Sequence, residues 1–147
     1  MKKQILLSLV ILTLLAVTAG AQTAPPILNP IGPKSINEGV NLTFNDTATD
    51  ADLTTPTLGA APLPTGASFV DNGNGTGTFT WLPGFTQAGV YNITFWAKDA
   101  VTPDSVAEIV TITVNFVNVA PVIAAIGNQS VNEGVNLNFN VTATDAN

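Results

Sequence analysis

The sequence of 147 residues contains no cysteine and no histidine. These two absences exclude disulfide bonds, thiolate nucleophiles, imidazole bases and the usual zinc ligands. Arginine is also absent, so all four basic residues are lysines. A domain built from this chain must therefore be stabilised by an apolar core. Hard metal ions bound by oxygen ligands are the cross-links that this composition still allows.

Positive charge is scarce, with four basic residues against ten acidic ones. Two of the four, Lys2 and Lys3, lie at the extreme N-terminus, which leaves Lys34 and Lys98 for the rest of the chain. A surface this acidic repels phosphate backbones and anionic lipid headgroups. We therefore expect no binding of nucleic acid, whereas divalent cations suit such a surface.

The N-terminus has the three-part layout of a secretory signal peptide. Lys2 and Lys3 precede an apolar run from Ile5 to Val17, and Ala19-Gly20-Ala21 supplies a small-residue cleavage site. The alternative is an uncleaved membrane anchor, but this run is shorter than the roughly 20 residues that span a bilayer. We predict that residues 1–21 are removed and that the protein is extracellular and associated with the cell surface.

One passage of the sequence occurs twice at an offset of 95 residues. Ile31–Asp52 and Ile126–Asn147 are identical at 16 of 22 positions. A unit of this length is the size of one immunoglobulin-like sandwich and is far longer than a solenoid repeat. We therefore predict a complete domain over residues 22–119 and the truncated start of a second domain of the same type over residues 120–147.

Period-2 alternation of apolar and polar residues predicts β-strands within the unit. Apolar residues alternate at Val40, Leu42 and Phe44, and again from Tyr91 to Ala97, whereas helical periodicity is confined to the N-terminal leader. The Asn-Gly dipeptides within residues 71–77 predict a hairpin turn. The chain is accordingly expected to be all-β, with about seven strands in an antiparallel β-sandwich.

Two aromatic positions leave alternatives open. Tyr91 follows "QAG" at the start of a predicted strand, which fits a tyrosine corner whose hydroxyl bonds back to the backbone, or an ordinary core residue. Trp81 is expected in the core. Trp96 alternates out of phase with Tyr91 and is either packed on the outer face or exposed as a platform for a sugar ring.

Several motifs in this order resemble a known family. "LPTGASF", "GTGTFTWLP", "QAGVYNITFWAKD" and "VTITVNFVNVAPV" are similar to the immunoglobulin-like and dystroglycan-type cadherin-like repeats of large bacterial and archaeal surface proteins. The resemblance implies a Greek-key immunoglobulin-like or cadherin-like sandwich, repeated in tandem as an extracellular spacer or adhesion module. It implies that the partners are neighbouring repeats of the same chain and cell-surface proteins or glycans. It also implies that the domain binds calcium (Ca²⁺). The acidic junction motif of cadherins is reduced here to "NFVN".

Paired carboxylates supply a starting point for a calcium site. Asp50 and Asp52 are two residues apart, so on extended backbone their side chains project from the same side. Calcium takes six to eight oxygen ligands, so further donors are needed, and we weigh this site against solvated acids that cap turns. The candidate ligands are Asp50, Asp52, Asp99, Glu38, Asn115 and Asn118.

Catalysis is not expected from this chain. Two carboxylates alone do not make a hydrolytic site, and the sequence has no serine elbow, no histidine or cysteine base and no arginine to hold an anionic substrate. The leading hypothesis is a non-catalytic structural or adhesion module. The alternative is a carbohydrate-binding accessory domain of a secreted polysaccharide-active protein, with Trp96 as the sugar platform.

Overall fold

The computed structural model describes residues 24–147. The predicted signal peptide, residues 1–21, lies outside these described residues. Between residues 24 and 147 no helix is long and apolar enough to cross a membrane.

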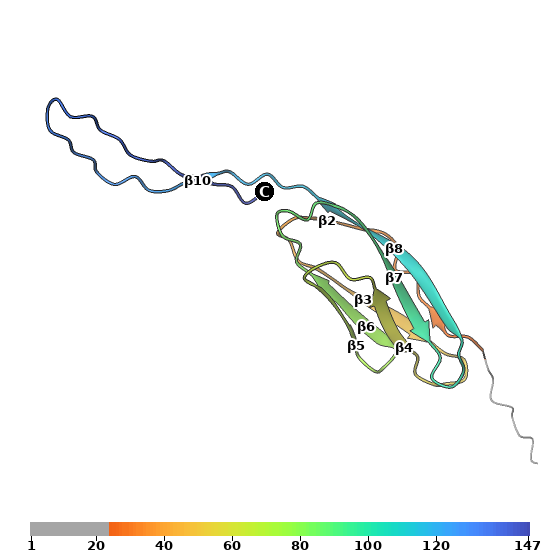
Figure 1. The fold of residues 1–147 in the computed structure, drawn as a ribbon. Helices are drawn as coiled ribbons and strands as arrows, with labels where there is room; N and C mark the ends of the chain where they lie inside the picture. The colour runs from red at the N-terminus through yellow and green to blue at the C-terminus, as the bar shows by residue number, and fades with distance from the viewer. Residues whose placement is uncertain (1–23) are drawn as a thin grey trace, which may run out of the picture.

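All regular secondary structure in residues 24–147 is β-strand, which confirms the predicted fold class. The strands form two four-stranded sheets and one two-stranded ribbon, and Figure 1 shows their arrangement. The strands are β1 (Ile27–Leu28), β2 (Lys34–Asn37), β3 (Leu42–Thr49), β4 (Thr57–Ala61), β5 (Ala67–Asp71), β6 (Thr76–Trp81), β7 (Gly89–Lys98), β8 (Ser105–Asn115), β9 (Val122–Ile123) and β10 (Ala143–Thr144).

The two larger sheets pack face to face as a sandwich. One sheet has the strand order β1-β3-β6-β5 and the other has the order β2-β8-β7-β4. All neighbouring pairs are antiparallel except β2 and β8, which run parallel. Strands that are consecutive in sequence, such as β3 and β4, lie in different sheets, which is the connectivity of a Greek-key sandwich.

The core lies between the sheets and follows the period-2 alternation of the strands. Alternate residues from Tyr91 to Ala97 face inward, as their spacing predicts. Phe44 and Phe79 of one sheet stack at 5.0 Å between ring centroids, and Phe95 of the opposite sheet lies 5.8 Å from Phe79. Each fully buried large apolar side chain contributes about 1.5–3 kcal/mol of hydrophobic stabilisation. The largest are Trp81, Phe79, Phe95, Ile93, Ile112 and Val110.

The predicted hairpin connects β5 to β6. Gly73 and Gly75 have φ values of +72° and +75°, a region that glycine enters without steric penalty. The amide of Asn72 donates to the carbonyl of Thr76 at 2.9 Å and closes the turn. The Asn-Gly dipeptides therefore act as their chemistry predicts.

Tyr91 forms the predicted tyrosine corner near the start of β7. Its hydroxyl donates to the carbonyl of Gln87, four residues upstream, at 2.9 Å. Its ring also packs edge-on against Trp81, with the centroids 4.8 Å apart. The side chain thus serves both the backbone corner and the apolar core.

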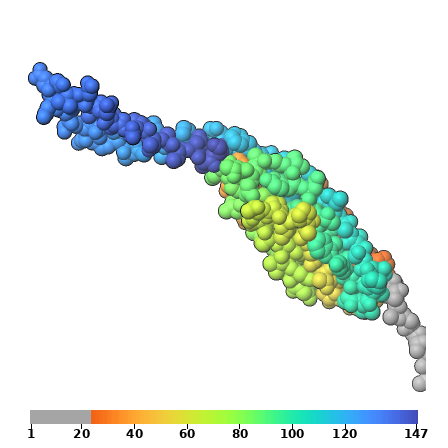
Figure 2. Space-filling model, in the orientation of Figure 1, coloured from red at the N-terminus to blue at the C-terminus, as the bar shows by residue number. Residues whose placement is uncertain are grey.

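The sandwich has two ends, which we call the entry pole and the exit pole. The entry pole is where β3 and β7 end, at Thr49 and Lys98, and β1 lies beside it. The exit pole is where β2 and β8 end, at Asn37 and Asn115. Residues 120–147, which we call the C-terminal segment, extend away beyond the exit pole as a long narrow loop (Figures 1 and 2).

Candidate functional site

Three of the six predicted calcium ligands come together at the entry pole. Asp50 and Asp52 lie in the loop after β3, and Asp99 directly follows β7. Because both strands end at this pole, a carboxylate oxygen from each of the three residues lies within 4.8 Å of the others. Of the residues that the structure describes, these three form the cluster of acids with the spacing of a metal site.

Each of the three carboxylates also caps a local turn. Asp50 Oδ1 accepts from the amide of Asp52 at 3.1 Å, and Asp52 Oδ1 accepts from the amide of Thr54 at 2.9 Å. Asp99 Oδ1 accepts from the amide of Val101 at 2.8 Å. The turn-capping interpretation is therefore correct for one oxygen of each acid, and these bonds hold the carboxylates in place.

One oxygen in this cluster has no partner. Asp50 Oδ2 is buried without a hydrogen bond. A buried polar atom that lacks a partner loses its hydration without compensation, which makes it a natural ligand for a cation. Asp99 is itself buried, and hydrogen bonds from the Thr102 hydroxyl and the Val101 amide hold its pKa below the ordinary value. Asp99 is accordingly ionised at neutral pH.

The other three predicted ligands lie at the exit pole. Glu38 follows β2, and its amide donates to the carbonyl of Asn115 at 3.0 Å. Asn115 directs its side-chain amide to Ser35 and Asn37. Asn118 is exposed. The six residues thus belong to opposite ends of the sandwich, and the structure assembles Asp50, Asp52 and Asp99 without Glu38, Asn115 or Asn118.

Glu38 acts as a clamp on backbone amides. The side chain is 2% exposed, and its Oε1 atom accepts from the amides of Gln87 at 2.9 Å and Ala88 at 2.7 Å. Its Oε2 atom accepts from the amide of Val117 at 3.0 Å. One carboxylate therefore ties the loop before β7 to the chain that leaves the sandwich.

Asp46 is a buried acid that sequence reasoning did not single out. It is 1% exposed in the middle of β3, and neither carboxylate oxygen has a hydrogen-bond partner. Burial raises its pKa to about 6; the backbone of Thr47 offsets part of this rise, and the negative charge of Glu108 adds a smaller rise of its own. The repeat contains a signal that position 46 is buried, because the equivalent residue 95 positions later is the apolar Val141.

The two tryptophans occupy different layers. Trp81 is fully buried, which confirms its predicted core position. Trp96 lies on the outer face, where its indole covers Gly59 so closely that an added Cβ would be 2.4 Å from the ring. The ammonium group of Lys98 lies 6.0 Å from the same ring. Trp96 is thus engaged in cross-strand packing.

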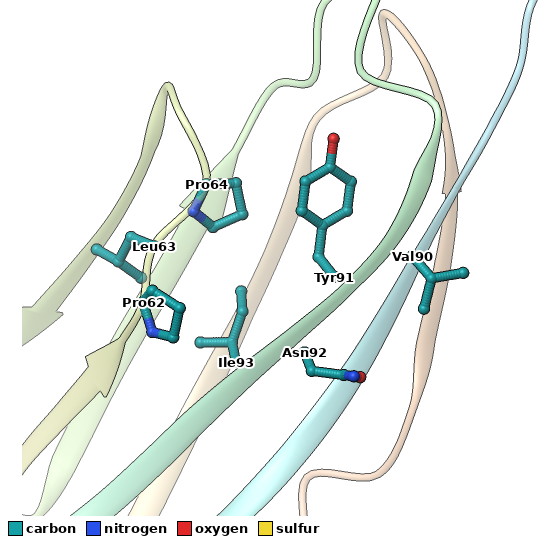
Figure 3. A pocket seen from close by; sticks show the side chains of 7 residues that line it. All are labelled: Pro62, Leu63, Pro64, Val90, Tyr91, Asn92 and Ile93. Carbon is teal, nitrogen blue, oxygen red and sulfur yellow. The ribbon is translucent and has the colours of Figure 1, made fainter.

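A surface hollow of about 250 Å³ lies between the turn after β4 and the start of β7 (Figure 3). Prolines 62 and 64 and the side chains of Tyr91 and Ile93 line most of it. The Tyr91 hydroxyl is already bonded to Gln87. The residues around this hollow supply apolar contact area and no acid–base pair.

A family model described as "Putative Ig domain" matches residues 25–115. No curated protein matches the chain in sequence. The match covers more than half of the chain and coincides with strands β1 to β8.

Solved structures show the same fold. The chain is similar to part of an endo-fucoidan hydrolase of glycoside hydrolase family 107, with 16% identity, a TM-score of 0.53, and coverage of 65% of this chain and 14% of that one. It is also similar to the N-terminal Ig1-2 module of the Drosophila receptor protein tyrosine phosphatase DLAR, with 16% identity, a TM-score of 0.51, and coverage of 69% and 57%.

A mutant of the SrpA adhesin from Streptococcus sanguinis is a third similar structure, with 14% identity, a TM-score of 0.50, and coverage of 64% and 57%. The chain therefore spans only a small part of the hydrolase and just over half of the other two proteins. At these identities the likeness concerns the fold alone. From the family match and this shared sandwich, the chain belongs to the family of Ig domains.

Proposed function

We propose that this chain is a non-catalytic extracellular module of a surface protein built from tandem Ig-like domains. The Ig-like fold is consistent with a structural or adhesion role, and SrpA, which shares the fold, is an adhesin. The predicted signal peptide accounts for export, and an apolar core without disulfides accounts for stability outside the cell. Its partners are neighbouring repeats and proteins of the cell surface.

One observation carries this proposal: the chain enters the sandwich at one pole and leaves it at the other (Figure 1). Domains connected in this way line up end to end, so each added unit lengthens the molecule. The longest strand, β8, has 11 residues. At about 3.3 Å per residue each unit therefore adds roughly 35 Å of length.

Small-angle X-ray scattering on concatenated copies of residues 22–119 tests the spacer role. The maximum dimension is expected to increase by roughly 35 Å per unit, as the strand length requires. A compact particle whose maximum dimension barely grows between two and four units would contradict a spacer.

We further propose that the entry pole binds calcium weakly through Asp50, Asp52 and Asp99. The support is the convergence of three carboxylates, together with the unpartnered Asp50 Oδ2 among them. These are the oxygen ligands that calcium prefers, and water fills the remaining positions of such a site. Weak extracellular sites of this kind have dissociation constants of about 10⁻⁴ to 10⁻³ M.

Thermal unfolding with calcium, magnesium or chelator tests the site. At ten times the dissociation constant, calcium adds about 1.4 kcal/mol of stability, which raises the melting temperature of a domain this size by several degrees. Asp50→Asn should abolish the rise. Asp145→Asn changes the equivalent acid of the C-terminal segment, outside the cluster, and should leave the rise intact. An unchanged melting temperature in millimolar calcium would exclude the site.

A further inference from the structure

The C-terminal segment has the backbone conformation of the opening strands of the sandwich. Strand β9 pairs with β10 in the register in which β1 pairs with β3, shifted by the 95-residue offset of the repeat. The matching hydrogen bonds also recur: Ala124 donates to Thr142 as Asn29 donates to Thr47. Gly134 has a φ of +79°, where the equivalent Gly39 has +73°. The segment therefore repeats the end-to-end pairing and the turn of residues 25–52, although the equivalents of β2 and of most of β3 are not strands in it.

The apolar side chains of this segment lack the partners that their equivalents have. In the sandwich, β3 pairs with β6 and β2 pairs with β8. Within residues 24–147 the C-terminal segment has no such neighbours, because β9 and β10 pair with each other alone. Phe139 and Val141 are consequently 49% and 57% exposed. In this chain of 147 residues a row of apolar side chains with strand spacing is thus exposed.

We propose that the C-terminal segment of one molecule takes the place of residues 25–52 in the sandwich of a second copy of this chain. The apolar row of the first molecule is then covered by strands β4 to β8 of the second. The main support is complementarity: the segment carries the same residues at 16 of 22 positions as the strands it would replace.

The connection to the sandwich makes this exchange intermolecular. β8, which the exchange leaves in place, ends at the exit pole at Asn115, whereas β1, whose place β9 would take, lies beside the entry pole. The six residues 116–121 reach at most about 22 Å, but the poles are roughly 30 Å apart along the strands. The segment therefore cannot replace the opening strands of its own sandwich while that sandwich stays folded. A second copy imposes no such limit.

The positions at which the two segments differ determine which of them fits the sandwich better. Val141 would replace Asp46, a buried acid whose two oxygens have no partner. Burying an apolar side chain there removes an uncompensated polar group. Val131 would replace Ile36, which is larger by one methylene. The loss of this buried group offsets part of the stability gained at position 46.

The opening strands of the molecule itself have one advantage, which is their covalent attachment. Attachment gives them an effective concentration in the millimolar range. Exchange is therefore expected to depend on protein concentration and to occur most readily while the chain folds. The products are closed dimers or open head-to-tail chains, because the interface joins two different surfaces.

Engineered cysteines test the exchange directly, since the natural chain has none. Asn45 and Thr78 are paired across β3 and β6, and their side chains meet at 3.3 Å on the outer face. The variant Asn140→Cys with Thr78→Cys places one cysteine at the equivalent position of the C-terminal segment. After refolding of the secreted chain at high concentration and mild oxidation, it should form disulfide-linked dimers and longer species. The control Asn45→Cys with Thr78→Cys should give cross-linked monomers.

A second variant keeps the test independent of folding defects. Val141→Asp puts the disfavoured acid into the C-terminal segment, where the side chain is exposed and the sandwich is untouched. It should reduce the cross-linked fraction several-fold with no change in the melting temperature of the monomer. The proposal is overturned by a chain that stays monomeric after refolding at high concentration. It is equally overturned by dimers whose cysteines at positions 140 and 78 do not cross-link, because the segments then pack against each other.

Discussion

At the scale of single residues, Glu38 is expected to contribute most to the exit pole. Glu38→Ala removes a carboxylate that accepts three backbone amides in a buried setting. Hydrogen bonds to charged groups contribute about 1.5–3 kcal/mol each, though the three are not additive. We expect the free energy of unfolding to fall by about 3 kcal/mol or more in urea denaturation.

The repeat provides a matched control for this substitution. Glu133 is the equivalent of Glu38 in the C-terminal segment, and it is exposed. Glu133→Ala should change the free energy of unfolding by less than about 0.5 kcal/mol, as for other surface positions. Equal effects of the two substitutions would show that the clamp at Glu38 does not stabilise the sandwich.

Asp46 makes stability depend on pH. Its carboxyl has an ordinary pKa of 3.8, which is raised to about 6 in the folded protein. Between these values the folded state binds more protons than the unfolded state, so stability decreases as pH rises, and it levels off above about 6. After allowance for partial screening, the loss is about 2 kcal/mol.

Urea denaturation at pH 4.5 and 7.5 checks the effect of Asp46. Asp46→Val, which installs the residue found at position 141, should remove this decrease and stabilise the protein at pH 7.5. Glu133→Gln neutralises an exposed acid and should leave the pH profile as it is. If Asp46→Val retained the full pH dependence, another group would have to be its source.

At the scale of elements, the β5–β6 hairpin depends on two glycines for different reasons. Both have positive φ, but an added Cβ at Gly75 would lie 2.7 Å from the carbonyl oxygen of Ala48, whereas nothing lies within 4 Å at Gly73. Gly73→Ala should therefore cost about 1 kcal/mol of stability from backbone strain alone. Gly75→Ala should cost about 2–3 kcal/mol, because the clash with β3 adds to that strain.

Thermal melting of the two variants side by side measures the difference. The contact with Ala48 is also a hydrogen bond, from the Ala48 amide to the Gly75 carbonyl at 2.8 Å. Equal melting temperatures for the two variants would mean that the hairpin moves away from β3 without penalty, and that this bond contributes little.

The elements that local chemistry dictates could be predicted from the sequence. The inward row from Tyr91 to Ala97, the Asn-Gly hairpin and the Tyr91 corner each depend on residues within one strand and its turn. The pairing of β2 with β8 could not be predicted in this way. It joins residues almost 80 positions apart, such as Asn37 and Asn115, and no local pattern encodes that register.

The same limit explains the candidate calcium site. Asp50 and Asp52 were recognisable because they are close in sequence, and Asp99 because it ends a strand. Glu38 also lies near a strand end, so the sequence alone groups it with these acids. Which pole a strand end occupies depends on the direction of the strand in the sheet, and for Glu38 that direction follows from the parallel pairing of β2 with β8.

At the scale of the whole molecule, a hydrogen bond joins residues 120–147 to the chain that leaves the sandwich. The side chain of Asn147 donates to the carbonyl of Val117 at 2.8 Å. The amide of the same Val117 donates to Glu38. Residues 116–119 are therefore expected to unfold together with the sandwich. The C-terminal segment beyond them is expected not to affect the stability of the sandwich at low protein concentration.

Two truncations separate these contributions. A chain of residues 22–119 should melt at the same temperature as residues 22–147, because it keeps every strand of the two large sheets and the Val117 bond. A chain ending at Asn115 loses that charge-assisted bond, which is expected to lower stability by about 1.5 kcal/mol and the melting temperature by several degrees. Val117→Pro in the longer chain removes the amide hydrogen and fixes φ, but keeps the rest of the chain, and should reproduce most of this decrease. If the truncation at Val119 lowered the melting temperature as much as the truncation at Asn115, the C-terminal segment would be part of the cooperative unit, and its opening strands would already be packed on the sandwich of their own molecule.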